Sequence, residues 1–72
     1  MKVYGSHLCE DTQKALKELK DVEFRNISED LSALKEFLAI RDNNPLYDDV
    51  KKNGGIGIPV FVLDDGTVTF DY

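Results

Sequence analysis

The chain has 72 residues, of which 42% are hydrophobic, and a formal net charge of −5. This length and composition predict one small globular domain spanning residues 1–72 and exclude an intrinsically disordered chain. The acidic balance argues against nucleic-acid binding and against an anionic membrane surface as a partner, because both need clustered lysine and arginine.

Apolar segments that direct a chain into or across a membrane are absent from the sequence. No run approaches the roughly 18 apolar residues of a membrane-spanning helix, and the N-terminus lacks the apolar stretch of a secretory signal. The chain has one cysteine, so no disulfide can form within it. We therefore expect a cytoplasmic protein, since a lone thiol without a signal fits a reducing compartment.

The first half of the chain predicts two strands, each followed by a helix. Residues 2–4 form a short apparent strand that Gly5 ends, and residues 10–20 follow with helical spacing, acidic at the start and basic at the end. Residues 22–27 alternate as a second strand. Ser28 is the expected N-cap of the next helix, whose apolar stripe consists of Leu31, Leu34, Phe37 and Leu38.

The second half predicts a short helix and a hairpin. Residues 42–45 break the long helix, and Pro45 suits the first position of one or two further helical turns. Residues 58–63 form an apolar strand, 64–66 a turn, and 67–70 the return strand. The order is β-α-β-α-short helix-β-β. We predict an α/β fold with a four-stranded mixed sheet, its first two strands parallel and its last two antiparallel.

Cys9 is the most informative residue, because it lies where the first strand gives way to the first helix. Unpaired backbone N–H groups and the positive end of the helix dipole favour a thiolate at such a junction. The alternative is a buried, inert thiol, and the neighbouring carboxylates of Glu10 and Asp11 oppose a second negative charge. Pro59 stands fifty residues further on, at the start of an apolar strand, where its missing N–H is harmless.

Two polar neighbours of the cysteine are further candidates. Thr12 follows Cys9 by three residues and shares its helix face, so its hydroxyl is a candidate donor to the thiolate; the alternative is an ordinary helical threonine. His7 is a candidate general base or an exposed loop histidine. His7 and Cys9 are too few ligands for a structural zinc site, and we predict no metal site.

Two segments resemble the glutaredoxin branch of the thioredoxin fold. They are Val-Tyr-Gly-Ser-His-Leu-Cys-Glu-Asp-Thr at residues 3–12 and Ile-Pro-Val-Phe at residues 58–61. Together with the element order, they make the chain similar to small bacterial glutaredoxin-related proteins over essentially its whole length. The resemblance implies a nucleophilic Cys9, a cis Pro59 that keeps other groups and metals from the thiol, and main-chain contacts from Ile58 to a bound thiol.

The sequence departs from the family at three places. Thr12 replaces the second cysteine of the active-site pair, as in monothiol glutaredoxins, which work through mixed disulfides with glutathione or a protein. Ser6 and His7 stand near the place of the family's basic residue. The Gly-Gly kink and the short helix after the last strand are missing, so we expect a thioredoxin-like fold that lacks the C-terminal helix.

The resemblance implies thiol-disulfide exchange in electron transport, through Cys9 and Thr12 with His7, Ile58 and Pro59 binding the substrate. The expected partners are protein or low-molecular-weight thiols and disulfides; no cofactor is required, and glutathione is a candidate co-substrate. Two alternatives remain open. One is a non-catalytic binding module on the same scaffold, and the other is an iron–sulfur cluster carrier that uses Cys9 from two subunits.

Overall fold

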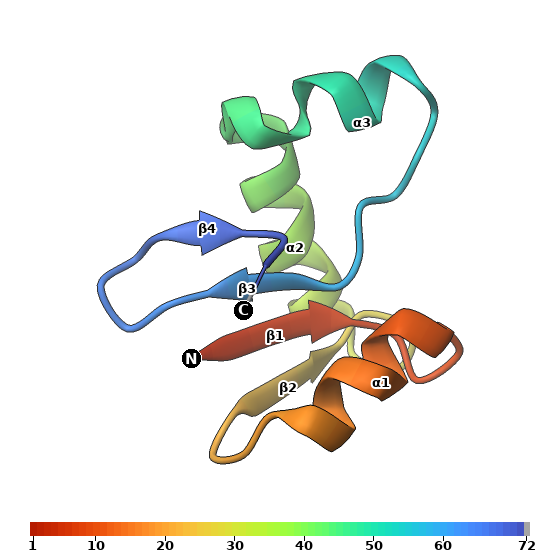
Figure 1. Cartoon of the computed structure of the whole chain (residues 1–72). Helices are drawn as coiled ribbons and strands as arrows, with labels where there is room; N and C mark the ends of the chain where they lie inside the picture. The colour runs from red at the N-terminus through yellow and green to blue at the C-terminus, as the bar shows by residue number, and fades with distance from the viewer. Residues whose placement is uncertain (72) are drawn as a thin grey trace.

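The structure of the protein is a computed structural model that describes residues 1–71. Its central element is a four-stranded mixed sheet. Tyr72, to which the predicted domain extends, lies outside the described residues. The strand order is β2-β1-β3-β4, so β2 and β4 form the two edges (Figure 1). The strands are β1 (Lys2–Gly5), β2 (Glu23–Asn26), β3 (Val60–Val62) and β4 (Val68–Thr69).

The strand directions agree with the prediction. β1 runs parallel to β2, with Val3 opposite Phe24, and antiparallel to β3, with Tyr4 opposite Val60. β3 and β4 form the antiparallel hairpin at the end of the chain. The predicted α/β class and mixed sheet are therefore confirmed. β2, β3 and β4 are shorter than the sequence pattern indicated, whereas β1 extends one residue further, to Gly5.

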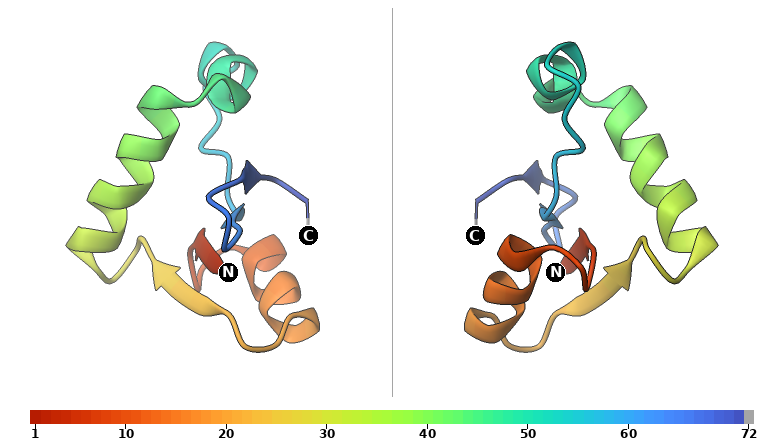
Figure 2. Two further views of the ribbon diagram at one scale, coloured as in Figure 1. Left: turned by 90° about the vertical axis from the view of Figure 1, so that its left-hand side faces the viewer. Right: turned by 90° about the vertical axis from the view of Figure 1, so that its right-hand side faces the viewer.

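Two helices cover opposite faces of the sheet (Figure 2). α1 (Glu10–Glu18) packs on one face and α2 (Leu31–Asn43) on the other. A 3₁₀ turn, η1 (Pro45–Tyr47), and α3 (Asp48–Lys52) follow and confirm the predicted short helical segment. No helix within residues 1–71 combines the length and the apolar character needed to span a bilayer.

The core is split by the sheet, because successive strand residues point to opposite faces. On the α1 side, Val3, Ala15 and Phe61 form a buried cluster. On the α2 side the buried cluster consists of Tyr4, Phe37, Tyr47 and Val60, and the Tyr47 ring makes edge-to-face contacts with Phe37 and Phe70. β1 thus contributes a buried side chain to each half of the core.

Polar contacts also tie α2 to the sheet. The Tyr4 hydroxyl donates to Glu36 Oε1 at 2.8 Å, and Arg25 reaches the same carboxylate with Nε at 3.2 Å and Nη2 at 2.8 Å. The hydrogen bonds from Tyr4 and Arg25 hold the pKa of the Glu36 carboxyl below its usual value. This pair of donors fixes the position of α2 along β1 and β2.

Two expectations about α2 were wrong. Asp30 caps the helix, because its carboxylate accepts from the N–H groups of Ser32 and Ala33, whereas Ser28 lies outside the helix. Leu31 and Leu38 are not part of a buried stripe, since they are 65% and 41% exposed. The buried face of α2 is built instead from Ala33 and Phe37, flanked by the half-buried Leu34 and Ile40.

The loop between α3 and β3 is held by two side chains from the helical region. The Tyr47 hydroxyl donates to the Gly57 carbonyl at 2.7 Å, and Arg41 Nη2 donates to the Gly55 carbonyl at 2.6 Å. Gly57 has a φ of +80°, and a Cβ at this position would lie 2.5 Å from Tyr47 Cε1. The close approach of Tyr47 therefore requires glycine here.

We predict that Gly57→Ala destabilises the protein more than Gly54→Ala. Both residues have positive φ, but a Cβ at Gly54 meets nothing within 4 Å. The Gly54 substitution carries only the backbone cost of about 1–2 kcal/mol, and the clash with Tyr47 adds about 1–3 kcal/mol to the Gly57 substitution. Urea denaturation of the two variants measures this difference, and equal losses would contradict the packing described above.

The two buried tyrosines predict a loss of stability in alkali. Burial raises the pKa of Tyr4 and of Tyr47 to about 12, from an ordinary value of 10.0. Above pH 10.0 the folded chain therefore retains phenol protons that the unfolded chain releases. The stability that the two protonated tyrosines contribute is complete below pH 10.0 and is lost as the pH rises to about 12. We expect the free energy of unfolding to fall over that interval, and less steeply in Tyr47→Phe and Tyr4→Phe than in the natural chain.

Candidate functional site

Cys9 is the N-cap residue of α1, with φ −98° and ψ 121°. Its carbonyl accepts from the Gln13 N–H at 3.0 Å, which begins the helix. The thiol is half-buried and makes no side-chain capping hydrogen bond. The first turn of a helix leaves backbone N–H groups without intrahelical partners, and these favour negative charge at this end. The predicted strand-to-helix junction at Cys9 is confirmed.

Pro59 lies at the same end of the sheet as Cys9. Because β1 and β3 are antiparallel and Tyr4 pairs with Val60, the chain leaves β1 toward Cys9 where it enters β3 from Pro59 (Figure 1). The Ile58–Pro59 peptide bond is cis, as expected. Ile58 and Pro59 are both half-buried, and the Ile58 side chain packs against the core on the α2 side.

Ser6 organises the loop that leads to the cysteine. It is 6% exposed, and its carbonyl accepts from the Cys9 N–H at 3.0 Å. Its hydroxyl accepts from the Leu8 N–H at 3.1 Å and hydrogen-bonds to the Ser28 hydroxyl. Each polar group of Ser6 is therefore used to hold residues 6–9 in one conformation.

Thr12 lies in the interior rather than on the surface of the site. The side chain is fully buried, and its hydroxyl oxygen accepts from the Ser6 N–H at 3.4 Å. A Cβ at Gly5 would lie 2.5 Å from this oxygen, so Thr12 packs directly against the backbone of β1. The hydrogen bond of Thr12 supports the loop before Cys9, and its predicted donation to the thiolate stays a prediction.

His7 is bound to the loop that follows β2. The Asn26 side-chain oxygen accepts from the Ser28 N–H at 3.0 Å, which leaves Asn26 Nδ2 to donate to His7 Nδ1 at 2.9 Å. The proton of a neutral His7 ring then lies on Nε2, 3.7 Å from Glu29 Oε1. Neither ring nitrogen offers a free lone pair in this arrangement, so the structure does not favour His7 as a general base.

Asn26 and Ser28 were not among the predicted site residues. The sequence does contain a local signal for them, because an asparagine two residues before a serine is typical of a turn in which the side-chain oxygen accepts the later N–H. That signal predicts a turn after β2. It does not reveal that this turn contacts the cysteine loop, since the contact depends on the parallel pairing of β1 and β2.

The surface around Cys9 combines apolar and acidic side chains. Leu8, next to the cysteine, is 76% exposed. Glu10 and Asp11 are exposed in the first turn of α1, where they interact favourably with the helix dipole. Within residues 1–71, no group of three or more histidine, cysteine, aspartate and glutamate side chains is placed to hold a metal ion.

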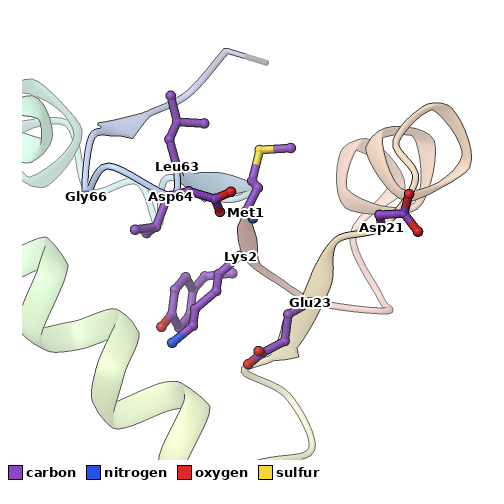
Figure 3. Close-up of a pocket in the computed structure, with 9 residues that line it drawn as sticks. Met1, Lys2, Asp21, Glu23, Leu63, Asp64 and Gly66 are labelled. Carbon is purple, nitrogen blue, oxygen red and sulfur yellow. Dashed lines mark hydrogen bonds and ion pairs between the residues drawn. The ribbon is translucent and has the colours of Figure 1, made fainter.

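A hollow of about 570 Å³ opens at the opposite end of the sheet (Figure 3). Its lining includes Met1, Lys2 of β1, Asp21, Glu23 of β2 and Asp64 of the β3–β4 turn. The terminal ammonium of Met1 lies 2.6 Å from Asp64 Oδ1 and closes part of this region. None of the predicted site residues lines the hollow, so it is separate from the cysteine site.

The chain has a relative among known proteins. The chain is 33% identical over 73 aligned positions to an uncharacterized protein of Haemophilus influenzae (strain ATCC 51907 / DSM 11121 / KW20 / Rd), covering 96% of this chain and 85% of that protein. The chain belongs to the family of that protein. No protein-family model matches the chain, and no solved structure matches it.

The contact between Gly5 and Thr12 gives a test of the packing beneath the site. We predict that Gly5→Ala lowers the free energy of unfolding by about 2–3 kcal/mol, because the added methyl group overlaps the Thr12 side chain. In the double variant, Thr12→Ala removes the overlapping atoms. We therefore expect a favourable coupling of at least about 1 kcal/mol between the two substitutions in urea denaturation; strictly additive losses would count against this contact.

Proposed function

We propose that this protein is a glutaredoxin-like thiol-disulfide oxidoreductase that uses Cys9 alone. On this proposal its mixed sheet with α1 and α2 on opposite faces is a thioredoxin-like fold without the C-terminal helix. The chain then joins the small bacterial glutaredoxin-related proteins that its sequence resembles.

The observation that carries the proposal is the position of the Cys9 thiol. It is partly accessible at the amino end of α1, and the segment that contains Pro59 enters the sheet at the same end. A free, accessible cysteine at a helix N-terminus is the arrangement in which a thiolate is favoured and can attack a disulfide.

The reaction consists of two thiol-disulfide exchanges. The Cys9 thiolate attacks one sulfur of a substrate disulfide, forms a mixed disulfide with it and releases the other sulfur as a thiolate. An external thiolate then attacks the substrate sulfur of the mixed disulfide, forms a new disulfide with it and releases the Cys9 thiolate. The electrons come from the external thiol, for which glutathione is a candidate. The reaction needs reduced Cys9, which suits the cytoplasm.

The neighbouring residues have supporting roles in this mechanism. The main chain of Ile58, two residues before β3, hydrogen-bonds to the incoming thiol compound, and Pro59 limits which groups reach the sulfur. Thr12 and His7 help to hold the loop before the nucleophile. Thr12 accepts from the Ser6 N–H, and the His7 ring bonds to the Asn26 side chain. The exposed part of the His7 ring adds a contact for the substrate.

A second candidate is a binding module that has lost redox chemistry. The specific observation in its favour is the pair of exposed carboxylates, Glu10 and Asp11, directly after the cysteine. Negative charges at this position oppose the thiolate that the mechanism needs. Both candidates use the same surface, and the reactivity of Cys9 distinguishes them.

Intact-mass spectrometry after exposure to oxidised glutathione or 2-hydroxyethyl disulfide tests the proposal. We expect the natural chain to gain one disulfide-linked adduct, which a reducing agent removes, and the Cys9→Ser variant to gain none. We also expect adduct formation to be at least about tenfold faster than for the same cysteine in the urea-unfolded chain, because only the folded chain places the thiol at a helix N-terminus.

An equal or slower rate in the folded chain would refute the redox proposal and favour the binding module. The uncharged 2-hydroxyethyl disulfide separates two causes of a slow reaction. A reaction with this compound but not with oxidised glutathione would keep the thiol chemistry and exclude glutathione as the co-substrate.

A further inference from the structure

Residues 5–7, from the last residue of β1 into the loop that follows, are held by residues 26–28, from the last residue of β2 into the next loop. The Ile27 N–H donates to the Gly5 carbonyl at 2.9 Å, the Ser28 hydroxyl bonds to the Ser6 hydroxyl, and Asn26 Nδ2 bonds to His7 Nδ1 at 2.9 Å. Residues 26–28 therefore form a support, which we call the 26–28 segment, for residues 5–7. Gly5 and Asn26 are the last register pair of β1 and β2, and the contacts of Ser6 and His7 with the 26–28 segment continue beyond that pairing.

Ser6 connects the 26–28 segment to Cys9 by hydrogen bonds. The Ser6 hydroxyl receives the Leu8 N–H at 3.1 Å, and the Ser6 carbonyl receives the Cys9 N–H at 3.0 Å. Loss of the Ser28 hydroxyl leaves the nearly buried Ser6 side chain with one partner fewer. The conformation of the loop then depends on the remaining bonds, and Cys9 is less firmly held as the N-cap of α1.

We propose that Ser28, assisted by Asn26, is a positioning residue for the Cys9 thiol. This inference rests on the proposed redox function and deepens it, because it assigns control of the nucleophile to a loop that was expected only to start the second helix. Ser28 does not touch the reacting sulfur. It acts by holding the Ser6 loop, which keeps the thiol at the amino end of α1, where backbone N–H groups stabilise its negative charge.

Two features separate this role from ordinary support of the fold. Ser28 lies in a loop and makes its hydroxyl contact with Ser6 rather than with either half of the core. The backbone of Ser28 is held independently, by Asn26 Oδ1, so that removal of the hydroxyl leaves the turn itself in place. The expected effect is therefore on the cysteine loop and not on the whole domain.

The test is the rate at which Cys9 reacts with 2,2′-dithiodipyridine, a small uncharged disulfide that transfers one pyridylthio group to the cysteine and releases pyridine-2-thione. We expect Ser28→Ala to lower the second-order rate constant of the folded chain about fivefold at neutral pH, which is the loss of roughly one helix-terminus interaction. Ser28→Thr retains the hydroxyl and should restore the rate to within about twofold of the natural chain.

Ser32→Ala provides the matched control. Ser32 also makes two side-chain hydrogen bonds, to Asp30 at 2.7 Å and from Arg25 at 3.2 Å, but it contacts no residue of the cysteine loop. We expect it to leave the rate unchanged. Amide hydrogen exchange gives a second measurement: in Ser28→Ala the N–H groups of Leu8 and Cys9 should exchange faster, while those of α2 remain as protected as in the natural chain.

The outcomes are distinguishable. A natural chain that fails to react with the reagent refutes the redox proposal itself. A reactive natural chain with an equal or faster rate in Ser28→Ala overturns the positioning role. A uniform rise in amide exchange over α1, α2 and the sheet also overturns it, because that result assigns Ser28 to general stability.

Discussion

The position of β1 inside the sheet is the constraint on which the rest of the structure depends. β1 pairs with β2 on one side and β3 on the other, and it places Val3 and Tyr4 in opposite halves of the core. A displacement of this strand would disturb both helices together. The same strand ends at Gly5, and the segment that follows carries Cys9, so a strand that is paired on both sides leads directly to the thiol.

Three segments converge at the carboxyl end of β1, and different residues hold each of them by hydrogen bonds. The loop before Cys9 depends on Ser6 and its hydrogen bonds. The 26–28 segment depends on a side-chain turn at Asn26. The segment before Pro59 is tied by the hydroxyl of Tyr47 and the guanidinium of Arg41. Because Tyr47 belongs to the core cluster on the α2 side, this part of the site is tied to the packing of the domain.

Local sequence patterns predicted most of the helices and strands, because residues that are close together in the chain determine where these elements form. Alternating apolar residues gave the strands, and the Asp-Asp-Gly turn at 64–66 gave the hairpin. The choice of helix cap is different. Ser28 and Asp30 are both good capping residues. The local sequence does not reveal that Asp30 caps the helix and that the Ser28 hydroxyl bonds to Ser6, in a distant part of the chain.

Helical spacing placed Thr12 on the same face of α1 as Cys9. It could not reveal how closely the β1 backbone approaches the Thr12 side chain. Because Gly5 has no side chain, the helix approaches until Thr12 contacts the strand and the hydroxyl turns inward to Ser6. The location of Cys9 was predictable from its own neighbours. The partners that hold it were not, because they depend on which strands lie side by side.

The two edges of the sheet differ in a way that bears on self-association. β4 is only two residues long, and it offers little unpaired backbone to an incoming strand. β2 is longer, but Glu23 and Arg25 place opposite charges on one of its faces, and a strand from another molecule would have to desolvate them. Both edges thus discourage the growth of a continuous intermolecular sheet, which protects a domain this small from amyloid-like aggregation.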